Sequence, residues 1–68
     1  MMTVKQARML RGLTQQQVAD ALNVNVDTYR RIEKNPQKAT IEMAVQFCCI
    51  VQKKLDKIFF GDNSTLGR

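Results

Sequence analysis

Apolar residues recur along this chain with the three- and four-residue spacing of helices, and no segment alternates with the two-residue period of a strand. The pattern therefore predicts an all-α protein. We expect helices over residues 3–11, 14–22, 25–34 and 40–51, followed by a short one near residues 55–60. These would form a compact five-helix bundle with one core. The predicted core residues are Val4, Ala7, Val18, Ala19, Leu22, Tyr29, Ile32, Ile41, Ala44, Val45, Cys48, Val51, Leu55, Ile58 and Phe59.

Side chains that can cap a helix stand at most of the predicted helix starts. Two of the capping threonines are followed three residues later by Gln6 and Gln17, which is the spacing of a capping box. The predicted N-cap residues are Thr3, Thr14, Asn25 and Thr40. Residues that favour a turn end the first three helices, and they are Gly12, Asn23 and the pair Asn35-Pro36.

The helix predicted over residues 25–34 has one apolar side and one bare, basic side. Tyr29, Ile32 and Glu33 fall on the first side when the residues are placed 3.6 to a turn. The basic side begins at the N-terminus of the helix, which is the end that usually meets bases in the major groove of DNA. Together with the helix before it and the tight turn at Asn23, this segment indicates DNA binding. The expected base contacts are Asn25, Val26, Asp27, Arg30 and Arg31.

These side chains differ in what they can recognise. Arg31 can bond a guanine in two places, Asp27 can accept from a cytosine, and Val26 can lie against a thymine methyl group. Asp27 also complements the helix dipole. Near phosphates its charge is repulsive, so it would restrict which sequences bind rather than add affinity.

Phosphate contacts are expected from a second set of residues. Gln15 begins a helix whose N–H groups attract anions, and a side-chain amide there can hold a phosphate. Arg30, although on the groove side, is also well placed for a phosphate. The expected phosphate contacts are Gln15, Gln16, Lys34, Asn35 and Lys38.

Composition agrees with an anionic partner and gives no sign of an enzyme. The 68 residues carry eleven basic and six acidic side chains, a net charge of +5, which favours a polyanion. Histidine is absent, and neither a carboxylate pair nor a phosphate-cradling glycine loop is present. We therefore expect no catalysis, no cofactor and no metal.

The two cysteines, Cys48 and Cys49, are adjacent, so a loop-closing disulfide between them is geometrically implausible. Free cysteines within a helix favour a reducing compartment, and we expect the cytoplasm. No signal peptide or membrane-spanning run is evident. Residues 1–60 are expected to form the domain, and residues 61–68 a flexible tail.

A set of residues at characteristic spacing runs through the first half of the chain. It consists of Arg8, Gly12-Leu13-Thr14-Gln15, Val18-Ala19, Asn23-Val24-Asn25 and Ile32-Glu33. Together they resemble the phage-repressor and Cro type of helix-turn-helix domain, also called XRE-type or lambda-repressor-like, over roughly residues 4–60. The resemblance implies a prokaryotic DNA-binding transcription regulator in which Arg8 pairs with Glu33 as a structural tie and Gln15 holds a phosphate.

The chain departs from the family pattern at a few positions. Asn23 and Gln52 stand where the family usually has glycine, and Lys34-Asn35 stands where Asn-Gly often follows the glutamate. The geometry of the turn at Gln52 is therefore open. Val26 and Asp27 are less typical readers of bases than Gln, Ser or Arg.

The first hypothesis is a sequence-specific repressor of the phage or mobile-element kind, acting at a promoter without chemistry. Specific binding would normally need a homodimer on two half-sites about 34 Å apart. The candidate dimer contacts are Phe47, Ile50 and Phe60, although Phe47 fits the core better, and an exposed Phe60 would be the sharper sign. The alternative is a protein-interaction module on the same scaffold, such as an antitoxin-like or anti-repressor partner.

Overall fold

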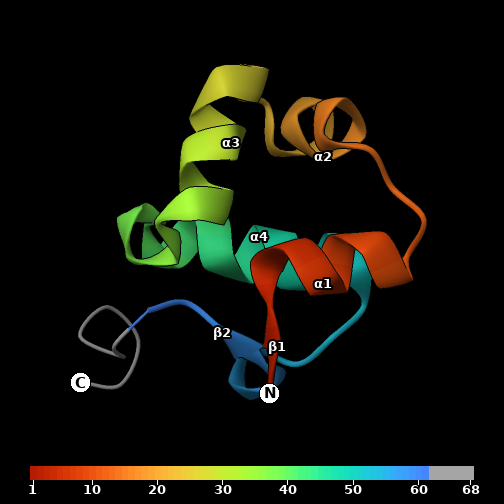
Figure 1. Cartoon of the computed structure of the whole chain (residues 1–68), viewed down its shortest axis with the longest axis vertical. Helices are drawn as coiled ribbons and strands as arrows, with labels where there is room; N and C mark the ends of the chain where they lie inside the picture. Colours follow the sequence, from red (N-terminus) through yellow and green to blue (C-terminus); the bar gives the residue numbers. More distant parts are fainter. Residues whose placement is uncertain (62–68) are drawn as a thin grey trace.

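A computed structural model describes residues 1–61 of the chain. In this range the chain forms four α-helices, two single 3-10 turns and a two-stranded sheet. Figure 1 shows how these elements are arranged. The helix α2 packs against α3 and α4, and α1 contacts α3 and the second strand. The elements are β1 (Met2–Thr3), α1 (Val4–Leu10), α2 (Gln15–Leu22), α3 (Val26–Lys34), η1 (Pro36–Lys38), α4 (Ile41–Val51), η2 (Leu55–Lys57) and β2 (Ile58–Phe59).

The mostly helical fold is confirmed, but the helix count of five and the absence of strands were wrong. The expected fifth helix is the single turn η2 followed by β2. β2 pairs in parallel with β1, with Met2 opposite Ile58 and Thr3 opposite Phe59. Ile58 and Phe60 point inward while Phe59 is exposed, so this segment does have the two-residue period of a strand. It is too short for that period to be distinguished from a helix by sequence.

The predicted N-caps of the four α-helices are confirmed by hydrogen bonds. Thr3 and Thr14 each accept from the backbone of the glutamine three residues on, and each glutamine side chain accepts in return, which completes both capping boxes. Asn25 accepts from the N–H of Asp27 at 2.8 Å, and Thr40 accepts from that of Met43 at 3.1 Å. These caps set where each helix begins, and thereby the direction in which α3 leaves the turn.

Three helices, α1, α2 and α4, end in a left-handed residue that closes a Schellman motif. These residues are Gly12, Asn23 and Gln52, with φ of 71°, 61° and 59°. In the last case the N–H of Gln52 donates to Cys49 O and the N–H of Lys53 donates to Cys48 O. Gln52 thus adopts the conformation that glycine would adopt, and the turn after α4 keeps its regular geometry at the expense of backbone strain.

Aromatic rings connect the layers of the core. The rings of Tyr29 in α3 and Phe47 in α4 are stacked with their centres 6.3 Å apart, and Phe60 meets Phe47 edge-on at the same separation. Phe60 is only 3% exposed, so its expected role as an exposed dimer contact was wrong. Phe47 is also buried, in agreement with its fit to the core. Ala39 is also buried, although the helical pattern did not predict it as a core residue.

The predicted core was wrong at Ile41, Val45 and Phe59, which are 55%, 46% and 42% exposed. In α4 the inward face consists of Ala44, Phe47, Cys48 and Val51, with the spacing of one helix side. Because nearly all of α4 is apolar, its sequence did not show which side would turn inward.

The chain beyond β2 passes close to η1. Gly61 is buried and has a φ of 97°. A Cβ atom there would lie 2.7 Å from the Cβ of Gln37, which is closer than packed carbon atoms allow, so only glycine fits. The expected flexible tail began at this residue, and its remaining residues 62–68 lie outside the described part of the chain.

Replacing Gln52 with glycine should stabilise the protein. Glycine adopts a positive φ without steric cost, whereas an L-residue is strained there, and the relief exceeds the added entropy of the unfolded chain. We expect Gln52→Gly to raise the free energy of unfolding by up to about 1 kcal/mol, or the melting temperature by roughly 4–8 °C. Thermal unfolding followed by circular dichroism would measure it. Asn23→Gly is the control and should gain less, because Asn tolerates this conformation; an unchanged or lower Tm for Gln52→Gly would contradict the account.

Candidate nucleic-acid interface

The candidate interface is formed by α2, α3 and the short turn between them. Asn23 ends α2 in the left-handed conformation, the N–H of Val24 donates to Ala19 O at 3.0 Å, and Asn25 already caps α3. Val24 packs against the core beneath the turn. Only three residues therefore separate the two helices, and their relative direction is set by backbone hydrogen bonds and by the packing of Val24.

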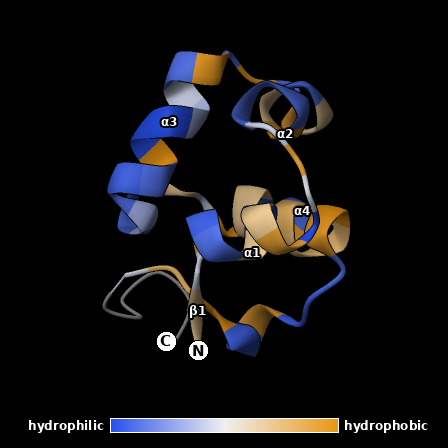
Figure 2. Ribbon diagram, turned by 45° about the vertical axis from the view of Figure 1, so that its right-hand side comes forward, coloured by the Kyte–Doolittle hydropathy of each residue, from blue (hydrophilic) through white to orange (hydrophobic). Residues whose placement is uncertain are grey.

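The inward and outward faces of α3 are sharply different. Tyr29 is fully buried and Ile32 is 6% exposed, which anchors one side of the helix in the core. Most of α3 is hydrophilic, as its mainly blue colour in Figure 2 shows. Val26 and Glu33 are half-buried at its edges. The exposed residues of α3 are Asp27, Thr28, Arg30, Arg31 and Lys34.

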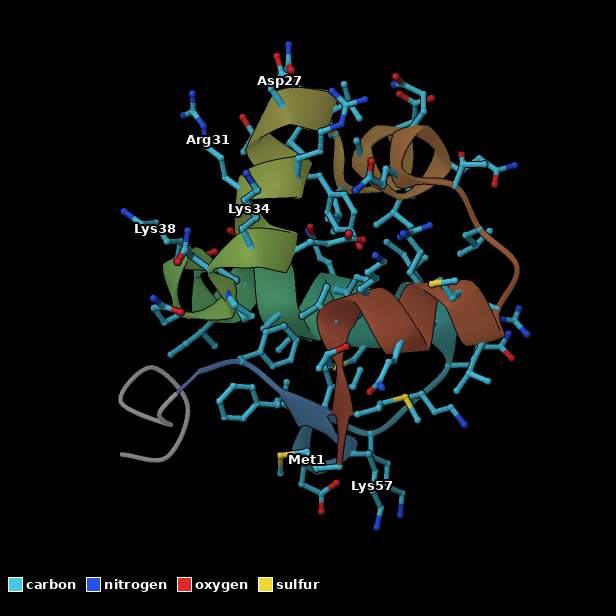
Figure 3. All side chains as sticks on the ribbon, viewed as in Figure 1. Met1, Asp27, Arg31, Lys34, Lys38 and Lys57 are labelled. Carbon is cyan, nitrogen blue, oxygen red and sulfur yellow. The ribbon has the colours of Figure 1, made fainter. Side chains whose placement is uncertain are left out.

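Several predicted contact residues share this outward side. Figure 3 shows Asp27 and Arg31 projecting from α3 away from the other helices, Lys34 lying over the front of α3, and Lys38 of η1 extending to the same side as Arg31. Asn35, at the end of α3, is exposed as well. Arg31, Lys34 and Lys38 thus gather exposed positive charge around the C-terminal half of α3 and the turn that follows it.

Glu33 connects α3 to α1 and α2. Its Oε2 accepts a short hydrogen bond from Arg8 Nε, and its Oε1 accepts from Gln15 Nε2 at 3.0 Å. Arg8 also donates through Nη1 to the carbonyl oxygen of Leu13 at 2.7 Å. The side chains of Arg8 and Glu33 are only 11% and 7% exposed. The structure thus brings Arg8 and Glu33 together as a largely buried ion pair. The hydrogen bonds from this pair to Gln15 and Leu13 fix the start of α2 beside α3.

Burial of Glu33 would by itself raise its pKa. The neighbouring Tyr29 hydroxyl and the hydrogen bonds from Arg8 and Gln15 favour the ionised carboxylate and outweigh burial, so the pKa of Glu33 is lowered. The pKa of Tyr29 is raised, first by burial and then by the nearby Glu33. The Tyr29 hydroxyl is buried beside the carboxylate but outside the geometry of a regular hydrogen bond. The carboxylate is therefore ionised at neutral pH.

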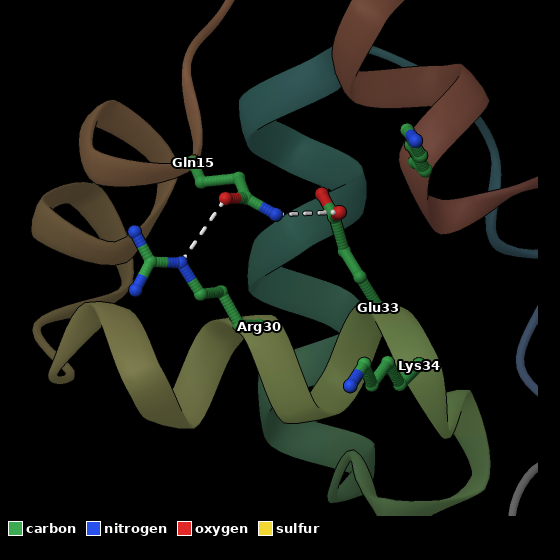
Figure 4. Close-up of a pocket in the computed structure, with 5 residues that line it drawn as sticks. Gln15, Arg30, Glu33 and Lys34 are labelled. Carbon is green, nitrogen blue, oxygen red and sulfur yellow. Dashed lines mark hydrogen bonds between the residues drawn. The ribbon is translucent and has the colours of Figure 1, made fainter.

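Gln15 continues this network onto the exposed side. Its Oε1 accepts from Arg30 Nε at 3.2 Å while its Nε2 is held by Glu33, as Figure 4 shows. Arg30 Nη1 in turn donates to Asp27 Oδ1 at 3.0 Å. Both groups of that last pair are largely exposed, so their ion pair contributes little to stability. Its consequence is geometric, because it holds the Arg30 guanidinium along the side of α3.

A shallow hollow of about 290 Å³ lies between the start of α2 and the side of α3. Three cationic residues line it together with Gln15 and Glu33, and these are Lys5, Arg30 and Lys34. Because Arg8 neutralises Glu33, the hollow has an excess of positive charge. Such a site can hold an anionic group of phosphate size.

The sequence did not indicate Lys5 as part of the site, whereas Gln16 and Asn25, which stay predicted DNA contacts, make hydrogen bonds within the protein. Lys5 lies in α1 and reaches the hollow only through the packing of α1 on α3. The Gln16 amide donates to Asp20 on its own helix at 2.8 Å. Asn25 Oδ1 is engaged in capping α3. The charge of Lys5 and its place near a helix start were visible in the sequence, but its distance from Gln15 was not.

A second hollow lies at the opposite end of the molecule. It has a volume of about 420 Å³ and is lined by Met1, Met2, Lys53 and Lys57; Figure 3 shows Met1 and Lys57 far from Arg31. Within residues 1–61, no three His, Cys, Asp or Glu side chains gather as metal ligands. No helix in this range has the length and apolarity to cross a membrane.

The short turn, the N-terminal caps and the exposed basic face of α3 together define a helix-turn-helix domain. A protein-family model described as helix-turn-helix matches residues 4–58. The chain belongs to this family, the XRE-type, Cro- and C1-like helix-turn-helix proteins, which are DNA-binding transcription regulators rather than enzymes. Neither a search of curated proteins nor a search of solved structures gave a significant match.

Because the pKa of Glu33 is lowered in the folded state, the stability of the domain depends on pH. The contribution of Glu33 is complete above the unfolded-state pKa of about 4.5 and is lost as the pH falls through the lower folded-state pKa. Glu33→Gln leaves Arg8 as an uncompensated buried charge and should destabilise the domain by about 3 kcal/mol at pH 7. The difference in free energy of unfolding between the wild type and Glu33→Gln should narrow as the pH falls from 5 to 2. Urea unfolding of both proteins across this range would test it; a gap that is constant with pH would exclude the ionised carboxylate as the cause.

Proposed function

We propose that this protein is a sequence-specific repressor of the phage or mobile-element kind that places α3 in the major groove of double-stranded DNA. The proposal rests on one observation: the outward face of α3 begins exposed at its N-terminus and continues beside the cation-lined hollow at the start of α2. A helix oriented in this way can meet base edges while the hollow and the lysines meet the backbone. Repression would follow from occupying a promoter.

The base-reading role fits the exposed side chains at the outward centre of α3. Arg31 is exposed and unconfined on that face, and its guanidinium can bond both acceptors of a guanine. Asp27 lies one turn before it and can accept from a cytosine amino group. Val26 is half-buried, so it offers a methyl surface close to the helix rather than a long reach. Asn25 would contribute through the amide nitrogen that capping leaves available.

The phosphate-binding role fits the residues around the hollow. Although Arg30 belongs to the groove-facing set, its Nε is held by Gln15 and its Nη1 by Asp27. We therefore assign Arg30 to a phosphate, together with Gln15, Lys5 and Lys34. Lys38 and Asn35 would contact the backbone further along, and Gln16 would have to leave Asp20 to do so.

A protein with this role would work in the cytoplasm, where its free cysteines stay reduced.

The first experiment is fluorescence anisotropy with a random-sequence duplex at several salt concentrations, followed by selection of a preferred duplex from a random pool. Affinity that falls steeply with salt would establish phosphate contacts. Absence of binding at low salt would refute the proposal and favour the protein-interaction alternative.

Arg31→Ala should separate base reading from backbone contact. Loss of a bidentate base contact should lower affinity for the selected duplex by about 10- to 100-fold, corresponding to about 1–3 kcal/mol, and should relax the preference at one base pair. Lys38→Ala is the matched control, since it removes one charge from the same side and should weaken binding to selected and random duplexes alike. Anisotropy titrations of both variants against both duplexes would measure this. Equal effects of the two substitutions would remove Arg31 from the base-reading set.

Asp27→Asn should increase binding to DNA of any sequence. The substitution removes a negative charge that faces the phosphates and releases Arg30 from its ion pair, so affinity for the random duplex should rise by roughly threefold to tenfold while discrimination falls. Asp56→Asn in η2, at the other end of the molecule, makes the same change in net charge and should raise affinity much less. If the two variants gained the same affinity for the random duplex, net charge rather than the position of Asp27 would explain the increase.

A further inference from the structure

The hollow at the end of the molecule opposite α3 is not part of the proposed DNA interface. It has a volume of about 420 Å³ and is lined by Met1, Met2, Lys53 and Lys57. Figure 3 shows Met1 and Lys57 at the bottom of the molecule, whereas Asp27 is at its top. A ligand bound there would therefore leave α3 free. We call these four residues the methionine–lysine hollow.

Backbone contacts between distant segments bring the four residues together. The parallel pairing of β1 with β2 places Met1 and Met2 beside the end of η2, where Lys57 lies. The chain turns back after α4, and the N–H of Lys53 donates to Cys48 O at 3.1 Å. Because backbone hydrogen bonds set both contacts, the hollow is a regular part of this fold.

Positive charge surrounds the hollow. Lys53, Lys54 and Lys57 are all exposed, and Asp56 is the only acidic residue in the range 51–61. Among the described residues none of these three lysines takes part in an ion pair. Their ammonium groups are therefore free to donate to the carboxylates or other anionic groups of a partner.

The two methionines narrow the class of anion that fits. Met2 is half-buried and packs against the core, while Met1 is 83% exposed. Methionine side chains are flexible and adapt to the shape of an apolar group, and the lysine stems add apolar surface below their charges. The phosphates of a DNA duplex would leave the methionines uncovered, and a flat bilayer would not enter a hollow. A peptide segment that carries carboxylates beside a large apolar side chain matches both features.

We propose that the methionine–lysine hollow binds an acidic segment of a partner protein. A large apolar side chain of that segment lies against Met1 and Met2, and its carboxylates accept from Lys53 and Lys57. The volume of about 420 Å³ is within the usual range of ligand sites. Because the hollow lies at the opposite end from α3, the protein can hold DNA and this partner together. The proposal adds a second partner and does not depend on the DNA-binding function.

Selection from a phage-displayed library of short random peptides tests the site without a known partner. The library is first depleted on the variant Lys53→Gln/Lys57→Gln and then selected on the wild-type chain, so that only peptides that need these two lysines are retained. We expect the retained peptides to be enriched in Asp and Glu and to carry a large apolar residue among them. If no peptide were retained, or if those retained had no excess of carboxylates, the proposal would be overturned.

A matched pair of variants locates a retained peptide on the protein by fluorescence anisotropy at physiological ionic strength. Lys53→Gln/Lys57→Gln should weaken its binding about tenfold, because two exposed charge contacts are lost. Lys34→Gln/Lys38→Gln removes the same charge beside α3 and should weaken it less than about threefold, because salt screens charges more than about 8 Å away. Circular dichroism would check that both variants are folded. Equal losses in the two variants would overturn the site.

A change in the peptide tests the role of the methionines without altering the protein. Replacing the large apolar residue of the retained peptide with glutamine should weaken binding to the wild-type chain about tenfold, because its apolar surface is no longer buried. A peptide that bound equally well after this replacement would overturn the contact with Met1 and Met2.

Competition with an unlabelled random-sequence duplex separates this proposal from the repressor. The peptide should stay bound when the duplex occupies α3, and a labelled duplex would report that occupancy in a parallel titration. Displacement of the peptide by the duplex would overturn the proposal, because the peptide would then share a site with DNA. A chain that bound the peptide but no duplex would retain the hollow and refute the repressor, whereas DNA binding without any retained peptide would do the reverse.

Discussion

The largely buried carboxylate of Glu33 is the group on which the arrangement of the site depends. It comes from α3, and its two oxygens are bonded to Arg8 of α1 and Gln15 of α2. A charge buried to this degree is tolerated only when its hydrogen-bonding capacity is used. Three helices are therefore held in one relative position, because moving any of them would leave a largely buried charge without its partner. Arg8 also bonds the Leu13 carbonyl oxygen, which fixes the loop that leads into α2.

From this buried group a chain of polar contacts leads outward to the face that we propose meets DNA. Glu33 orients the Gln15 amide, Gln15 orients Arg30, and Arg30 is held by Asp27. The contacts become more exposed from Glu33 toward Asp27. The contact of Arg8 with Glu33 therefore contributes to stability, whereas the contact of Arg30 with Asp27 mainly orients the Arg30 side chain. Rigidity at the buried end would reduce the entropy lost when the exposed end binds an anion.

A protein of this size has few residues to spare, and one element often has two uses. Tyr29 fills the core next to Phe47 and lies beside Glu33. The helix α4 supplies the buried side of the core through Phe47 and Val51, while its other side is left apolar and uncovered. The edge-on packing of Phe60 on Phe47 brings the end of the described chain back onto the core, while Ile41 and Val45 of α4 are exposed.

Local sequence determined the helices and their ends. Capping threonines, Asn23 and Asn25 act within four residues of themselves, so their effects were readable from the chain, and the bounds of the four α-helices follow from them. The basic face of α3 was readable for the same reason, because helical geometry alone separates Arg31 from Tyr29 and Ile32. Gln52 adopts the turn geometry that glycine would, since the hydrogen bonds that end α4 compensate for the strain.

Tertiary structure alone decided which apolar residues of α4 and β2 were buried, and which cations joined Gln15. An apolar helix can present either side to a core, and the choice depended on the partners Tyr29 and Phe60, which are distant in the chain. The pairing of β1 with β2 joins residues more than fifty positions apart, and no local pattern encodes such a contact. Lys5 reaches the hollow for the same physical reason: its position is set by the packing of α1 against α3, not by its neighbours in the sequence.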